Sequence, residues 1–80
     1  MNQRTWRISD LNGGRYEGDA ANVVKQLRVA CLTKAQTPRD YMIEFADRAH
    51  FFTKRHIDVT SAARFLRSAC DAGLLKEIIE

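Results

Sequence analysis

The sequence predicts one α+β domain over residues 1–80, mostly helical, with an amino-terminal β-hairpin, three helices and a short carboxy-terminal strand. Three observations predict this fold class. Residues 5–17 alternate polar and apolar on either side of a glycine-rich turn, which is typical of a hairpin. Three later segments repeat apolar residues at helical spacing and are bounded by capping or glycine signals. A chain of this length has material for only one hydrophobic core.

The predicted hairpin begins with Thr5–Ile8, which alternates and is rich in strand-forming residues. Asp10–Gly14 supplies turn residues that tolerate a positive φ, and Arg15–Glu17 resumes the extended pattern. Gly18 then ends the hairpin, and Asp19 can cap the helix that follows.

The first helix is predicted from Asp19 to about Ala35. Its apolar residues form one stripe about 100° wide on a helical wheel. Val29 and Leu32 fall on the opposite side of that wheel, so another element or a partner must cover them. The stripe consists of Ala20, Val23, Val24, Leu27, Ala30 and Cys31.

The second helix is predicted from Pro38 to about Thr53. Thr37 offers a capping hydroxyl, Pro38 suits the first helical position, and Asp40 follows three residues after the cap. Ile43 and Phe51 lie off the apolar stripe. That stripe consists of Tyr41, Met42, Phe45, Ala46, Ala49 and Phe52.

The third helix is predicted to start at a Thr60 cap and to end before Gly73, which suits a left-handed helix stop. Residues 74–79 fit a short helix as well as a strand. A strand added to the hairpin is favoured, because a terminal helix of under two turns is marginal. The inward residues are Ala62, Phe65, Leu66 and Ala69, and the outward ones are Arg64, Arg67, Ser68 and Asp71.

The positive charge is concentrated in one stretch. The net charge is +3, and residues 51–67 hold four basic residues against one acidic residue, while the rest of the chain is balanced. The basic residues are candidate nucleic-acid contacts in a degenerate helix-turn-helix. The connection before the third helix is long for that motif and lacks glycine, so a solvated helix face is the competing interpretation. The four candidates are Lys54, Arg55, Arg64 and Arg67.

The apolar residues off the helical stripes are a second anomaly. Contiguous exposed apolar residues on a small protein often mark an interface, although two helices that wrap a compact core give the same pattern. The leading functional hypothesis is therefore a non-enzymatic module that binds a protein partner or self-associates, and nucleic-acid binding is the alternative. The candidate partner surface consists of Val29, Leu32, Ile43 and Phe51.

Chemistry-bearing motifs are absent from the sequence. His50 and His56 are six residues apart, and Cys31 and Cys70 lie on separate predicted helices, so we expect no metal site. No nucleophile or phosphate-loop motif predicts an enzyme or a cofactor. The amino terminus lacks the apolar core of a signal peptide, and no run is long enough to cross a membrane, so a cytoplasmic location is expected.

The chain resembles small bacterial proteins of unknown function over residues 15–75. The resemblance consists mainly of core apolar residues and helix stops, so it implies a fold rather than an activity, and it implies no catalytic residues. It is carried by Gly18, Val23, Val24, Leu27, Tyr41, Met42, Ala46, Arg48, Phe65, Leu66, Gly73, Leu74 and Leu75.

Overall fold

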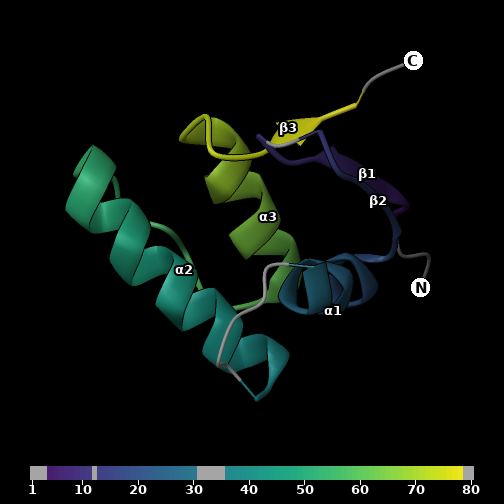
Figure 1. Cartoon of the computed structure of the whole chain (residues 1–80), viewed down its shortest axis with the longest axis horizontal. Coiled ribbons are helices and arrows are strands. Elements are labelled where there is room, and N and C mark those ends of the chain that lie inside the picture. The colour runs from purple at the N-terminus through teal and green to yellow at the C-terminus, as the bar shows by residue number, and fades with distance from the viewer. Residues whose placement is uncertain (1–3, 12, 31–35, 79–80) are drawn as a thin grey trace.

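A computed structural model of the chain describes residues 4–11, 13–30 and 36–78 (Figure 1). It confirms the predicted α+β fold and the order of its elements. Along the chain these are strands β1 (Trp6–Ser9) and β2 (Arg15–Gly18), helices α1 (Ala20–Ala30), α2 (Pro38–Thr53) and α3 (Ala62–Asp71), and strand β3 (Lys76–Glu77). Among the described residues, no helix is both long enough and apolar enough to span a bilayer.

The three strands form an antiparallel sheet in the order β2-β1-β3. The prediction of a strand within residues 74–79 is confirmed, because Lys76 and Glu77 pair with Ser9 and Ile8. The Ile78 N–H donates a further hydrogen bond of 2.8 Å to the Arg7 carbonyl oxygen. The last strand therefore joins the first one, which becomes the centre of the sheet.

Asp10 organises the hairpin turn. Its carboxylate accepts hydrogen bonds from the Gly14 N–H at 2.7 Å and from the Tyr16 hydroxyl at 2.8 Å. Gly13 has a φ of +88°, which glycine adopts without steric cost. The acidic side chain thus satisfies two donors and fixes the register of β1 and β2.

The helices cover one face of the sheet, and Figure 1 shows α2 on the far side of α1 and α3 from the strands. Tyr41, Phe45 and Phe65 meet in tilted and edge-to-face contacts with ring centroids 5.1 to 6.2 Å apart. This aromatic cluster joins α2 to α3. The buried core consists of Trp6, Ile8, Val23, Val24, Leu27, Tyr41, Met42, Ala49, Ile57, Phe65, Leu66, Ala69 and Leu75.

The predicted cap of the third helix is wrong by one residue. Ser61, not Thr60, has the extended backbone of an N-cap, and its hydroxyl accepts the Arg64 N–H at 3.2 Å. The Thr60 N–H is already bonded to the Asp58 carboxylate at 2.8 Å. The cap of α2 is as predicted, since the Thr37 hydroxyl accepts the Asp40 N–H.

The first helix is described only as far as Ala30, which is exposed rather than part of the core stripe. Cys31 and Leu32, which the sequence placed on this helix, lie outside the described residues. Val29 is 67% exposed, in agreement with its position on the outer side of the wheel.

Candidate functional site

The connection between α2 and α3 packs along α3 instead of forming a tight helix-turn-helix turn. The Asp58 N–H donates to the Ser68 hydroxyl at 3.0 Å, and that hydroxyl donates to the Phe65 carbonyl at 3.1 Å. Ile57 is buried in the core. The prediction that Ser68 faces outward is therefore wrong, because this half-buried hydroxyl anchors the connection.

Two of the four predicted nucleic-acid contacts interact with the protein itself. An Arg55 guanidinium nitrogen donates to the Asp71 carbonyl at 3.1 Å, and an Arg64 nitrogen lies 3.9 Å from an Asp58 carboxylate oxygen. Lys54 and Arg67 are exposed. Two of the four cations are thus engaged by oxygens of Asp71 and Asp58, and the other two lie exposed.

Asp58 is held in its charged form. The side-chain hydroxyl and the backbone N–H of Thr60 donate to its carboxylate and lower its pKa below the ordinary value of 3.8, against a smaller opposing effect of desolvation. The positive charge of Arg64 acts in the same direction. This carboxylate consequently remains an anion beside the basic residues at neutral pH.

Two exposed phenylalanines end α2. Phe51 and Phe52 are 72% and 78% exposed, and their rings meet edge to face with centroids 5.3 Å apart. Phe51 was predicted to face outward, but Phe52 was predicted to belong to the core stripe, which is wrong. We call this pair the aromatic end of α2.

The direction of α2 explains why Phe52 is uncovered. The helix has sixteen residues and α3 has ten, so at a rise of about 1.5 Å per residue α2 is longer than α3 by about one and a half turns. Figure 1 shows that the last turns of α2 lead away from α3. The last turn of α2 thus lies away from the helix that covers the rest of its apolar stripe.

A shallow apolar hollow of about 200 Å³ lies beside the aromatic end. It is lined by Phe45, Arg48, Ala49, Phe52 and Leu74, so it lies between α2 and the turn that follows α3. Residues 48–56 contain three cationic side chains and two histidines but no acidic residue. Arg48 lines the hollow and the Lys54 ammonium lies near the Phe51 ring, so two cations adjoin the exposed aromatic rings.

The chain after the aromatic end is held in a defined conformation. Lys54 has a left-handed backbone with a φ of 61°, and its N–H donates to the His50 carbonyl at 2.9 Å. The Thr53 hydroxyl donates to the Ala49 carbonyl at 2.7 Å and accepts the Arg55 N–H at 3.1 Å. The Lys54 ammonium consequently lies 5.9 Å from the centre of the Phe51 ring.

The turn also brings together two histidines that do not share a helical face in the sequence pattern. The rings of His50 and His56 lie 6.4 Å apart at nearly a right angle, and both line a hollow of about 270 Å³ with Asp47. Among the described residues, no group of three or more potential ligands could hold a metal ion. The thiol of Cys70 is half-buried, and burial raises its pKa, which disfavours a reactive thiolate.

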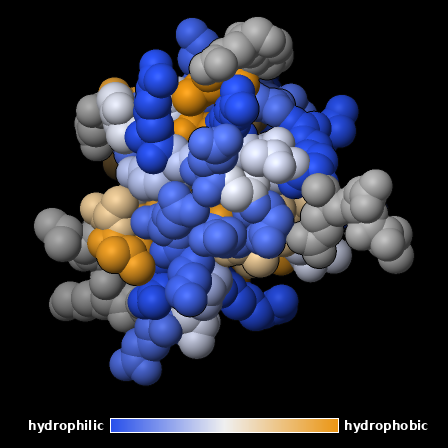
Figure 2. Space-filling model, turned by 90° about the vertical axis from the view of Figure 1, so that its right-hand side faces the viewer, coloured by the Kyte–Doolittle hydropathy of each residue, from blue (hydrophilic) through white to orange (hydrophobic). Residues whose placement is uncertain are grey.

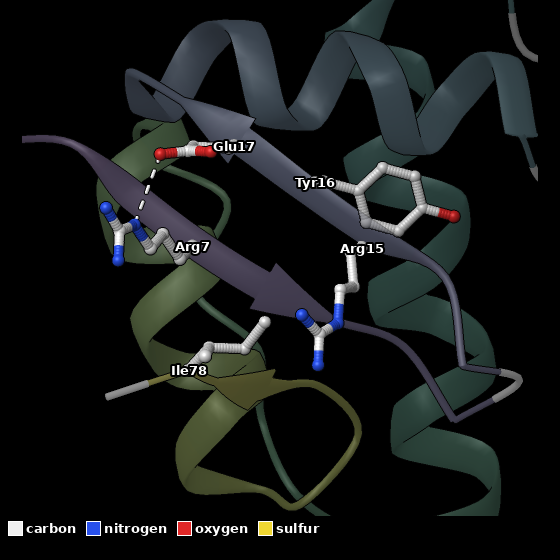
Figure 3. A pocket seen from close by; sticks show the side chains of 5 residues that line it. All are labelled: Arg7, Arg15, Tyr16, Glu17 and Ile78. Atoms are coloured by element: carbon white, nitrogen blue, oxygen red, sulfur yellow. Dashed lines mark hydrogen bonds and ion pairs between the residues drawn. The ribbon is translucent and has the colours of Figure 1, made fainter. Parts of the chain in front are cut away.

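A third feature, the open face of the sheet, was not predicted from the sequence. A hollow of about 340 Å³ on this face is lined by Arg7, Arg15, Tyr16, Glu17 and Ile78 (Figure 3). Local charge counts conceal these cations, because Asp10 and Glu17 lie near Arg7 and Arg15 in the sequence. Pairing the strands, which depends on contacts far apart in the sequence, is what brings the cations together.

No known protein family matches the chain, and no match is found among curated proteins or among solved structures. The resemblance to small bacterial proteins therefore stays a prediction.

Proposed function

We propose that the protein is a non-enzymatic interaction module that binds a short acidic segment of another protein at the aromatic end of α2. The observation that carries this proposal is the exposure of Phe51 and Phe52 at 72% and 78%. Aromatic residues are enriched at the centres of protein interfaces, and burying such a ring contributes much of the binding energy.

The adjoining hollow supports a partner with a large apolar side chain. Phe52 and Leu74 form two of its walls, and Ala49 leaves space between them. An apolar side chain placed there would cover Phe52 in the way that α1 and α3 cover the rest of the stripe. The gain comes from removing these apolar surfaces from water.

The surrounding charge favours an acidic partner over a second copy of this chain. Arg48 and Lys54 adjoin the rings, and a symmetric dimer through this surface would bring two sets of these cations together. Glutamate or aspartate side chains beside the apolar anchor would instead meet opposite charge. Val29 and Ile43 are exposed as well, but neither lines the hollow beside Phe52.

The proposal can be tested with a designed acidic amphipathic peptide that carries leucines on one helical face and glutamates elsewhere. We expect binding to shift the backbone NMR signals of residues 45–56 and Leu74. Phe52→Ser should weaken binding about tenfold, as is typical of an interfacial aromatic anchor. Lys54→Glu should also weaken binding, because the introduced charge repels the peptide. This loss of affinity should be larger at low salt concentration, since salt screens the repulsion.

Leu11→Ser is the matched control, because Leu11 is an equally exposed apolar residue in the hairpin turn. The same peptide with lysine in place of glutamate should not bind. Equal affinity of the Phe52→Ser and Leu11→Ser variants would contradict the proposal. A dimeric solution mass that Ile43→Glu or Phe51→Glu converts to a monomer would assign the surface to self-association instead.

Nucleic-acid binding through Lys54, Arg55, Arg64 and Arg67 has weaker support. Arg55 and Arg64 already interact with Asp71 and Asp58, and phosphate contacts would have to compete with those interactions. The packed connection also lacks the tight turn that presents a reading helix.

A further inference from the structure

We propose that the open sheet face binds a phosphate group through Arg7, Arg15 and Lys76, with Ser9 between them. We define the open sheet face by these four residues. The helices cover the opposite face, where Trp6 and Ile8 are buried. This inference is independent of the acidic partner proposed for α2.

The strand register places three of these residues in one row. Ser9 is paired with Arg15 on one side and with Lys76 on the other. Side chains of directly paired residues lie on the same face of a sheet, and adjacent strands are about 4.8 Å apart. Two long cationic side chains thus flank a hydroxyl and can converge above it.

Arg7 adds a third cation from the neighbouring row. It is paired with Glu17 across the hairpin, and its Nε lies 3.1 Å from a Glu17 carboxylate oxygen. Figure 3 shows Arg7 and Arg15 over the same hollow, with Arg15 reaching from β2 across the end of β1. Ile78 extends into this hollow from the third strand and gives it one apolar wall.

The open sheet face carries a net positive charge, because Glu17 pairs with only one of its three cations. Within the part of the chain that the structure describes, no hydrogen bond or ion pair joins the side chain of Arg15 or Lys76 to another residue. Glu77 is paired with Ile8 and so belongs to the opposite face, where it forms an ion pair with Arg4. Among the residues that the structure describes, Glu17 is thus the one acidic side chain that lines the hollow.

These donors fit a phosphate group better than an acidic protein surface. Three strands each supply a cation and the central strand adds a hydroxyl, so the donors can reach different oxygens of one dianion. The face seen in Figure 2, from the side on which the sheet lies in Figure 1, is largely hydrophilic. The four residues that define the open sheet face are charged or carry a hydroxyl, whereas the centre of a protein interface is depleted of charged residues.

The test is a titration of isotope-labelled protein with inorganic phosphate at pH 8 and constant ionic strength. We expect saturable shifts in the backbone NMR signals of Ser9, Arg15 and Lys76. Arg15→Ala and Lys76→Ala should each weaken binding about two- to fivefold, as expected for exposed charge pairs. Glu17→Gln should tighten binding, because it removes the repulsive carboxylate.

Arg39→Ala is the control, because Arg39 is an exposed cation at the start of α2, away from the sheet. The dispersion of each spectrum reports whether the variant keeps its fold. Absence of shifts at Ser9 and Lys76, or equal binding by Arg15→Ala and Arg39→Ala, would overturn the proposal.

A second titration, with a short single-stranded oligothymidylate, distinguishes the source of the phosphate group. Displacement of inorganic phosphate from the same residues would identify a nucleic-acid backbone. Phosphate binding that the oligonucleotide does not affect would identify a free phosphate ester. Binding of the oligonucleotide alone, with no response to inorganic phosphate, would overturn a site for a single phosphate group.

Discussion

Asp58 shows how one residue can hold a connection in place without being buried in the core. Its carboxylate accepts the Thr60 N–H, its own N–H donates to Ser68, and Arg64 lies near its second oxygen. These contacts fix the path of the chain between α2 and α3. They also make the stability of the protein depend on the charge of this one group.

The lowered pKa of Asp58 predicts a loss of stability in acid. The contribution of the charged carboxylate is complete above its ordinary pKa of 3.8, and it is lost as the pH falls below that value through the lower pKa of the folded state. Asp58→Asn should therefore be less stable than the original chain at pH 7. Urea unfolding at pH 7 and at pH 3 should show this difference becoming smaller in acid.

The effect of Thr60 provides an internal check on this prediction. Its hydroxyl is the largest cause of the lowered pKa, so Thr60→Val should show part of the same change in pH dependence. A stability difference between Asp58→Asn and the original chain that is the same at both pH values would contradict the assigned role of the carboxylate.

At the scale of the element, the start of α3 depends on Ser61. Ser61→Ala removes the hydroxyl that accepts the Arg64 N–H and should cost about 1 kcal/mol of unfolding free energy. Ser61→Asp should restore most of this stability, because a carboxylate accepts the same bond and interacts favourably with the helix amino terminus. Thermal or urea unfolding measures both variants, and an unchanged stability of Ser61→Ala would show that another group caps α3.

The elements differ in how much of their structure the sequence could predict. Pro38 and the Thr37 cap defined the start of α2, because both signals act within one helical turn. Thr60 and Ser61 carry similar hydroxyls, and the choice between them depended on Asp58, whose carboxylate binds the Thr60 N–H. The exposure of Phe52 depended on the direction of α2 relative to α3, which a helical wheel does not contain.

The candidate surfaces also differ in whether they depend on one element or on the packing of several. The outward positions of Ile43 and Phe51 came from helical periodicity alone. The grouping of Arg7, Arg15 and Lys76 required the pairing of strands that are far apart in the sequence. Sequence periodicity therefore predicts which side of an element is exposed, whereas a site built from several elements requires the tertiary register.

At the scale of the whole molecule, the aromatic cluster around Phe65 should dominate stability. Phe65 is fully buried and contacts Tyr41 and Phe45, so Phe65→Ala should cost about 3–5 kcal/mol through the cavity it leaves. Phe52→Ala removes the same group from an exposed position and should change stability by about 0.5 kcal/mol or less. Equal losses in urea unfolding would show that Phe52 is packed in solution.

The position of the first strand at the centre of the sheet has a consequence for folding. The hairpin closes locally, but β3 can pair with β1 only after a loop of nearly the whole chain has closed. Among the described residues, it brings two paired residues and the Ile78 hydrogen bond to offset that entropy. We therefore expect β3 to dock last, onto helices that are already packed. Lys76 would then complete the open sheet face in the final folding step, and a phosphate ligand would favour the fully closed chain over a partly folded one.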